Sequence, residues 1–248
     1  MDNEGLKQVY DQMHSKGSSE WFGQGEEERE LILKMGDPWE GKDVIEIGCG
    51  EGSLTKLIYL HNALISGVDY SSIAIRKAIE RYPEIQFYEN DYRKLITKTD
   101  RIVMQGVLEH LDDPFTELKW IMDNLLTEKG DVITSSPCFL NPRGVVWMTL
   151  DMLGAVMSKT DLHFLDPRQF VTFCHDNMYN LSWQTCDYSW AHGTEMIKDL
   201  TQRIPLALKD GNIPYKQDKF DSYMEWMGQK FIQHMGWLGA TAVYKISK

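Results

Sequence analysis

Short apolar runs rich in β-branched residues alternate with longer amphipathic stretches through the middle of the chain. Apolar runs of this length, bounded by glycine and polar residues, predict β-strands. Five are predicted in the first part of the chain, at Val44–Ile47, Leu64–Val68, Ile85–Tyr88, Arg101–Gln105 and Asp131–Thr134. Strands that alternate with helices over short links predict a mostly parallel sheet with helices on both faces.

The stretches between these runs predict helices. One follows the first strand through about His61, and others cover Ser72–Arg81 and Pro114–Leu126. Two more are predicted before the first strand, over 3–16 and 26–35. The second of these opens with three consecutive glutamates, which stabilise a helix N-terminus.

The pattern changes after the fifth strand. Residues 139–165 form a long apolar connection that is not an ordinary short loop. A helix over Pro167–Asn177 and a strand over Leu181–Cys186 return to the earlier rhythm. Two more helices are predicted in 194–235, and a last strand over Ala240–Ile246. The two insertions are expected to lie over the strand ends, where open α/β sheets bind ligands.

Composition and charge narrow the class of protein. The 248 residues are 42% hydrophobic, which suits one large α/β domain with a sizeable core. A formal net charge of −11 makes nucleic acid an unlikely partner, because binding through phosphates needs clustered Lys and Arg. The cysteines form no CxxC pair, so no metal site or disulfide framework is predicted; they are Cys49, Cys138, Cys174 and Cys186.

Neither the N-terminus nor any internal run predicts a membrane segment. The first residues, MDNEGLKQVYDQ, are polar and lack the apolar stretch of a signal peptide. The longest apolar run, Val145 to Met157, is interrupted by Asp151 and is too short to span a bilayer. We expect a soluble, cytoplasmic protein.

A glycine-rich turn between the first strand and its helix is the strongest chemical signal. It reads Glu46-Ile47-Gly48-Cys49-Gly50-Glu51-Gly52. Glycines at Gly48 and Gly50 let the backbone approach a ligand closely. Dinucleotide-binding enzymes place GxGxxG at the same point, but here an acid precedes the first glycine by two residues. A cofactor that carries an ammonium group gives that acid a reason to be there.

Acids also end the next two strands. Asp69 follows the second strand, where a carboxylate can accept both hydroxyls of a ribose. Asp91 follows the third, where a side chain can reach an adenine amino group. Together they predict a nucleoside site without choosing between cofactors.

Four motifs in order, EIGCGEG, GVDYS, END and QGVLEHLDDP, resemble the class I S-adenosylmethionine-dependent methyltransferases. The resemblance covers roughly residues 40–188 and is greatest to the small-molecule branch that includes the ubiquinone-biosynthesis O-methyltransferases. It implies a Rossmann-like, seven-stranded, mostly parallel sheet with helices on both faces and a helical cap. It also implies S-adenosylmethionine as methyl donor and S-adenosylhomocysteine as product.

The resemblance assigns roles to particular residues. Glu46, Gly48, Cys49 and Gly50 are expected around the methionine part of the cofactor, Asp69 on the ribose, and Tyr70 against the adenine. Asp91 and Tyr92 are expected at the adenine edge, and Gln105 and Gly106 beneath the sulfonium. Tyr10 and Trp21, in a segment that often folds over the cofactor, are candidate contacts or packing residues of a cap helix.

A hydroxyl acceptor needs a base to take its proton, whereas the transfer itself needs little beyond alignment. His110 and His163 are the candidate bases. For His110 a structural or cofactor-adjacent role competes, and for His163 an imidazole held by backbone hydrogen bonds. No metal is predicted, because Asp112-Asp113 alone does not establish a site for one.

We predict a single domain with three kinds of segment: cap helices in 1–38, a cofactor-binding core in 39–138, and substrate-cap insertions in 139–165 and 190–238. Methionines and tryptophans in the first insertion, Trp147 among them, favour an apolar lid over the acceptor. The predicted function is methylation of an oxygen or nitrogen of a small organic acceptor. An RNA-modifying methyltransferase and a non-catalytic cofactor-binding protein remain open alternatives, and so does the oligomeric state.

Overall fold

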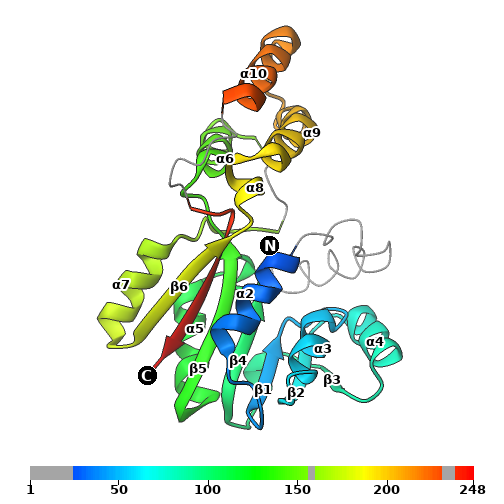
Figure 1. Cartoon of the computed structure of the whole chain (residues 1–248), viewed down its shortest axis with the longest axis vertical. Helices are drawn as coiled ribbons and strands as arrows, with labels where there is room; N and C mark the ends of the chain where they lie inside the picture. Colours follow the sequence, from blue (N-terminus) through cyan, green and yellow to red (C-terminus); the bar gives the residue numbers. More distant parts are fainter. Residues whose placement is uncertain (1–24, 156–159, 231–237) are drawn as a thin grey trace.

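Seven strands form one sheet in the order β3-β2-β1-β4-β5-β7-β6 within the part of the chain that the structure describes (Figure 1). The structure is a computed structural model and describes residues 25–155, 160–230 and 238–248. The strands are β1 (Asp43–Ile47), β2 (Leu64–Asp69), β3 (Gln86–Glu89), β4 (Thr99–Gln105), β5 (Leu126–Pro137), β6 (Asn180–Cys186) and β7 (Thr241–Ser247). β7 runs antiparallel to β5 and β6, and the other paired strands of the sheet are parallel. The predicted Rossmann-like α/β fold is confirmed.

The helices begin where the sequence supplies capping residues. Asp166 caps α7 in a capping box with Gln169, and Asp113 and Ser71 cap α5 and α4. The helices are α2 (Glu26–Gly36), α3 (Ser53–Tyr59), α4 (Ser72–Arg81), α5 (Pro114–Asn124), α6 (Pro142–Met152), α7 (Pro167–Asn177), α8 (Tyr188–His192), α9 (Thr194–Asp210) and α10 (Gln217–Lys230), with short 3₁₀ turns η2 (Tyr92–Lys94) and η3 (Leu108–His110).

Helices cover both faces of the sheet, as the alternation predicts. On one face, α2 and α3 bury Ile32 and Ile58 against alternate residues of the central strands. On the other face, α5 and α7 form the larger core, in which the rings of Phe170 and Tyr244 stack with their centroids 3.7 Å apart. Because successive strand residues point to opposite faces, each central strand contributes to both cores.

The strand β5 is longer than predicted. It runs from Leu126 to Pro137, whereas the sequence predicts only Asp131–Thr134. The polar residues between Leu126 and Asp131 indicated a loop between the helix and the strand. In the structure Leu126 already pairs with Thr99 of β4, and the register of the two strands shifts between Thr99 and Arg101. At its other end β5 continues because β7 pairs with it as far as Pro137. The preceding helix, α5, accordingly ends at Asn124.

The sequence predicts α2 as part of a cap, but the structure places this helix on one face of the sheet. It packs on the sheet, with Leu31 and Ile32 buried among residues of β1, β4, β5 and β7. Figure 1 shows it lying across the face of the sheet, with its N-terminal end toward the carboxyl ends of the strands. The predicted helix over 3–16 lies outside the described residues.

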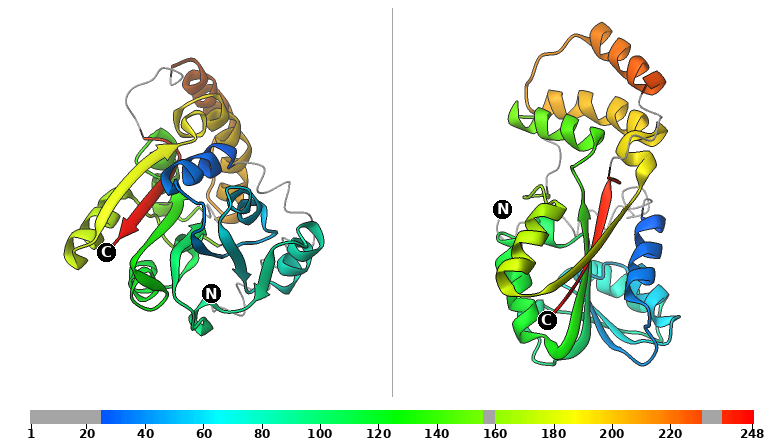
Figure 2. Two further views of the ribbon diagram at one scale, coloured as in Figure 1. Left: turned by 60° about the horizontal axis from the view of Figure 1, so that its bottom comes forward. Right: turned by 60° about the vertical axis from the view of Figure 1, so that its left-hand side comes forward.

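The helices α6, α8, α9 and α10 form a separate cluster beyond the carboxyl end of β5 (Figures 1 and 2). Phe139, Trp147 and the apolar side of α9 make its core, with Trp147 fully buried. The ring of Trp147 is enclosed between helices of this cap, so it belongs to the core of the cap. That the first insertion forms a lid over the acceptor stays a prediction. Met157, at the end of the apolar run in that insertion, lies outside the described residues.

No helix among the described residues combines the length and apolar character needed to cross a bilayer.

Candidate cofactor-binding site

The turn after β1 has the backbone shape that its glycines predict. Gly48 and Gly50 have φ angles of 72° and 52°, in the left-handed region that glycine adopts without strain. The N–H groups of Gly48 and Cys49 both donate to the Val68 carbonyl oxygen, which fastens the turn to β2. A Cβ on Gly48 would lie 2.6 Å from Val107 Cγ2, so the turn also lies directly against the residues that follow β4.

A cavity of about 390 Å³ opens at this turn, along the carboxyl ends of β1, β2 and β4. Eight of the predicted site residues line it; they are Glu46, Gly48, Cys49, Gly50, Asp69, Tyr70, Gln105 and Gly106. His110 lines it as well. The sequence therefore identified residues that the fold brings to one place.

Glu46 is buried in the floor of the cavity. Its Oε2 accepts a hydrogen bond from the Thr55 hydroxyl of α3 at 2.5 Å. Burial raises the pKa of the Glu46 carboxyl to about 8, and Thr55 and the Arg29 guanidinium offset only part of that effect. A bound ammonium group would favour the ionised form of this carboxyl, so Glu46 suits a cationic ligand.

Asp69 is held by backbone donors on both of its oxygens. Its Oδ2 accepts from the Gly50 N–H at 2.9 Å, and its Oδ1 from the Ser71 N–H at 2.8 Å. Each carboxylate oxygen has a further lone pair, so the group can also accept from two hydroxyls of a ribose. Tyr70, the next residue, is half-buried at the cavity wall.

Gln105 joins β4 to the first turns of α2. Its Nε2 donates to Glu28 Oε2 at 2.5 Å, and its Oε1 accepts from Arg29 Nε at 3.5 Å. Burial, with a smaller contribution from Asp187, raises the pKa of the Glu28 carboxyl. Glu28 and Arg29 both line the cavity, so α2 supplies one of its walls.

The two candidate bases lie in different places. His110 lines the cavity, and its Nδ1 lies 3.0 Å from the Thr160 carbonyl oxygen and 3.3 Å from a carboxylate oxygen of Asp161. A carbonyl oxygen only accepts, so Nδ1 of His110 carries a proton. His163 does not line the cavity; its Nε2 lies 3.1 Å from the Asp112 carbonyl oxygen. This contact agrees with the backbone-held alternative, and a role of His163 as a base stays a prediction.

Asp91 and Tyr92 do not line the cavity either. Asp91 caps η2 by accepting from the Arg93 N–H, and the Tyr92 hydroxyl donates to Glu117 of α5 at 2.5 Å. Their contact with an adenine stays a prediction. Tyr10 and Trp21 lie outside the described residues.

A family profile described as a methyltransferase domain matches residues 23–184, which is more than half of the chain. The chain belongs to the methyltransferase-domain family. The match runs from the segment before α2 into β6, so every residue that lines the cavity except Thr241 lies inside the matched region.

This methyltransferase domain is similar to the ubiquinone biosynthesis O-methyltransferase of Coxiella burnetii, with 32% identity over 100 residues. The matched segment covers 37% of this chain and only 40% of the length of that relative. The similarity therefore supports membership of the same family and does not show that the two proteins share a substrate.

Solved structures agree in fold. Phosphoethanolamine N-methyltransferase 2 of Haemonchus contortus, in complex with S-adenosyl-L-methionine, has a TM-score of 0.56 and 14% identity, covering 89% of this chain and 52% of that one. Magnesium protoporphyrin IX methyltransferase of Synechocystis PCC 6803, with bound S-adenosylhomocysteine, has a TM-score of 0.55 and 19% identity. The match covers 70% of this chain and 89% of that one. The methyltransferase domain has the class I S-adenosylmethionine-dependent fold.

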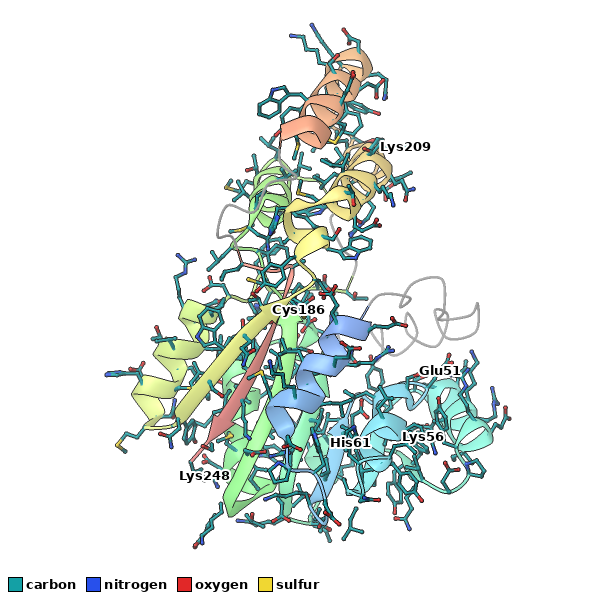
Figure 3. The ribbon with its side chains drawn as sticks, in the orientation of Figure 1. Glu51, Lys56, His61, Cys186, Lys209 and Lys248 are labelled. Carbon is teal, nitrogen blue, oxygen red and sulfur yellow. The ribbon has the colours of Figure 1, made fainter. Side chains whose placement is uncertain are left out.

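Four charged residues of the cavity were not predicted as site residues from the sequence: Glu28, Arg29, Glu51 and Glu109. Glu51, labelled in Figure 3, forms ion pairs with Lys77 and Arg81 of α4 at 3.1 and 3.0 Å. From the sequence alone, the acidic start of α2 is interpreted only as a helix-stabilising charge. The position of these four residues in the cavity wall is the signal that identifies them, and it exists only in the folded chain.

A second cavity of about 140 Å³ adjoins the first on the side of the cap. The two share Glu28, Pro137 and Thr241 as wall residues. Arg143 of α6 and Trp190 of α8 complete the second cavity, so the cap of the methyltransferase domain contributes directly to it. In the part of the chain that the structure describes, no three His, Cys, Asp or Glu side chains are grouped to hold a metal ion.

Proposed function

We propose that this chain transfers a methyl group from S-adenosylmethionine to an oxygen or nitrogen of a small organic acceptor. The observation that carries the proposal is the joint presence of Glu46, the glycine turn and Asp69 on one cavity at the carboxyl edge of the sheet. There, Glu46 would pair with an ammonium group, the glycine turn would let the backbone lie close to the ligand, and Asp69 would bind a ribose.

The residues present fit the cofactor group by group. The methionine part would lie on Gly48 and Gly50, with its ammonium group at the buried carboxyl of Glu46. The ribose hydroxyls would donate to Asp69, whose two oxygens already point into the turn. When bound, S-adenosylmethionine supplies a methyl group on a cationic sulfur, and the acidic walls of the cavity favour a cation.

The second cavity is the proposed location of the acceptor. It adjoins the cofactor cavity through Glu28, Pro137 and Thr241, so an acceptor there would lie beside the carboxyl end of β5 and the start of β7. Arg143 and Trp190 of the cap helices line this cavity, so they would position the acceptor for an aligned displacement. The acceptor's proton would pass to a group on the turn after β4, where Glu109 and His110 are adjacent.

Among acceptor atoms, oxygen and nitrogen are both compatible with this proposal. The cavity beside the cap is small, which favours an acceptor whose reacting end is compact. The prediction of a cytoplasmic protein that acts on a small molecule is kept as part of the proposal.

The experiment that tests the function is incubation of the purified protein with methyl-labelled S-adenosylmethionine and a library of hydroxyl- and amine-bearing metabolites. The expected result is label in one group of related acceptors, with an equal amount of S-adenosylhomocysteine formed. Tight binding of the cofactor without transfer to any acceptor, or transfer to RNA instead, would overturn it.

A further inference from the structure

Glu109 is a buried carboxyl in the cofactor cavity whose function is not accounted for by the site described above. It is 3% exposed, lies in η3 and lines the cavity. Among the described residues, its Oε2 accepts no hydrogen bond. A buried carboxyl oxygen without a partner is costly, so its presence at a ligand cavity indicates a ligand that interacts with it.

We propose that Glu109 responds to the charge of the bound cofactor: it is ionised opposite the cationic sulfur of S-adenosylmethionine and protonated opposite the neutral sulfur of S-adenosylhomocysteine. The inference rests on the proposed function, and it names the group that receives the acceptor's proton. Each turnover then ends with one proton on Glu109.

The turn after β4 holds this carboxyl where the sulfur is expected. A Cβ on Gly106 would lie 3.5 Å from Glu109 Oε1, so the carboxyl lies over the end of β4. Val107 lies against Gly48, where the methionine part of the cofactor would bind. In the cofactor, the sulfur joins the methionine part to the ribose and carries the methyl group toward the acceptor. The sulfur is therefore expected between Gly48 and the carboxyl end of β4.

The backbone around Glu109 is fixed from the other side. Its carbonyl oxygen accepts from the N–H groups of Leu162 and His163, at 2.8 and 3.3 Å. These two bonds attach the segment before α7 to η3. Glu109 is therefore held in place by the chain itself and does not need a ligand to be positioned.

The charges that face Glu109 come from three directions. Glu28 of α2 and Asp161 of the segment before α7 both repel a charge on it, and His110 is its neighbour in η3. Burial is the largest effect, and together with these two carboxylates it raises the pKa of Glu109 well above its usual range. Around Glu28 lie Asp187 and Arg29 as well. Without a cationic ligand, these surroundings favour the protonated form of Glu109.

The step balances in atoms and charge. The acceptor oxygen or nitrogen forms a bond to the methyl carbon, and the carbon–sulfur bond breaks with its electron pair left on sulfur. The acceptor's O–H or N–H bond breaks, and its proton passes to the Glu109 carboxylate. One cation and one anion are consumed, and the neutral thioether then faces a neutral carboxylic acid.

His110 is the alternative proton acceptor on the same turn. Its Nδ1 is engaged by Thr160 and Asp161, which orients the ring from the cap side. That arrangement makes it a positioning residue for the turn that carries Glu109. The charge coupling is assigned to Glu109 because its side chain is more deeply buried than that of His110 and because, among the described residues, its Oε2 accepts no hydrogen bond.

The test is calorimetric titration with S-adenosylmethionine and with S-adenosylhomocysteine, each in buffers of different ionisation enthalpy, which counts the protons released on binding. Both ligands carry the ammonium group, so any proton lost from Glu46 is common to both and cancels in the comparison. The expected result near neutral pH is about one more proton released with S-adenosylmethionine than with S-adenosylhomocysteine.

In Glu109→Gln this excess should vanish, while the proton count and affinity for S-adenosylhomocysteine stay close to those of the unmodified protein. The preference for the methyl donor over the product should fall by about tenfold or more. Glu117→Gln is the matched control, because Glu117 is also buried but lies on α5 outside the cavity. That variant should keep the excess.

Equal proton counts for the two ligands in the unmodified protein would overturn the proposal. So would an excess that persists in Glu109→Gln, and an excess lost only in Glu28→Gln would move the assignment to Glu28. If neither ligand binds, the proposed function fails instead, and the two failures are distinguishable. Unchanged affinity for S-adenosylhomocysteine shows that a variant is folded.

Discussion

The carboxylate of Asp69 accepts a hydrogen bond from the backbone N–H of Gly50 at 2.9 Å, which joins the end of β2 to the turn after β1. The bond fixes the Asp69 carboxylate beside Gly50, whose backbone lines the cavity. The two parts of the site that bind ribose and methionine in our proposal are thus one hydrogen-bonded unit, and a change in either should affect both.

Asp69→Ala should weaken binding of S-adenosylhomocysteine by about 1–3 kcal/mol, because hydroxyl contacts and the bond to Gly50 are lost together. Calorimetric titration measures this directly. Asp123→Ala, at an exposed position on α5, is the control and should bind normally. An unchanged affinity in Asp69→Ala would move the ribose to another place.

Gly48→Ala should reduce cofactor affinity by at least about tenfold, because the new Cβ meets Val107 and the φ angle of 72° strains any other residue. The double variant with Val107→Ala removes the clash but keeps the backbone strain. It should therefore recover only part of the affinity, as measured by equilibrium binding. Normal binding by the single variant would contradict the close approach.

Affinity for S-adenosylhomocysteine should increase with pH up to about pH 8, where the Glu46 carboxyl of the free protein titrates. The sign follows from the raised pKa: below it Glu46 is protonated, and pairing with the ligand's ammonium group first requires losing that proton. Glu46→Gln should bind more weakly and lose this pH dependence. Affinity that falls over the same interval, or a slope kept in Glu46→Gln, would show that the ammonium group binds elsewhere.

For the unliganded protein the same pKa has the opposite consequence for stability. The folded state holds a proton on Glu46 that the unfolded chain releases at its ordinary, lower pKa, so this residue's contribution to stability falls as pH rises toward about 8.

His110→Ala should lower methyl transfer by about tenfold or more with little change in cofactor affinity, because the ring lines the cavity and orients the turn after β4. His163→Ala should leave both within about twofold, since its ring lies on the Asp112 carbonyl outside the cavity. Steady-state rates with an identified acceptor compare the two. A greater loss of rate in His163→Ala than in His110→Ala would reverse the assignment.

Asp131→Ala should destabilise the fold by about 3–5 kcal/mol, because the Arg101 guanidinium, with a side chain only 3% exposed, would lose its counter-charge. Denaturation by urea measures the change in the free energy of unfolding. Lys119→Ala removes an exposed ion pair of α5 and should cost less than about 1 kcal/mol. Similar small losses in both variants would contradict the buried-pair account.

The sequence predicted the parts of the site that depend on local pattern. Glu46, Gly48 and Asp69 occupy fixed positions relative to strand ends, and parallel strands end at one edge of a sheet, so their meeting follows from topology alone. The same reasoning placed the two insertions over that edge, where the cap lies.

The surroundings of residues whose role depends on packing could not be predicted from the sequence. Glu28 reaches the cavity only because α2 lies on the sheet face, and no periodicity specifies which end of the helix approaches Gln105. Trp147 is a residue type that suits an apolar lid, but its ring is buried against α9 within the cap. His163 has suitable chemistry, yet the path of the chain before α7 carries it away from the cavity.

The most direct test of the central claim is a crystal structure of the protein grown with S-adenosylhomocysteine. Density for the ligand should follow the turn after β1, with the amino group at the Glu46 carboxyl and the ribose hydroxyls on Asp69. Density on other residues, or an empty cavity at saturating ligand, would contradict the account.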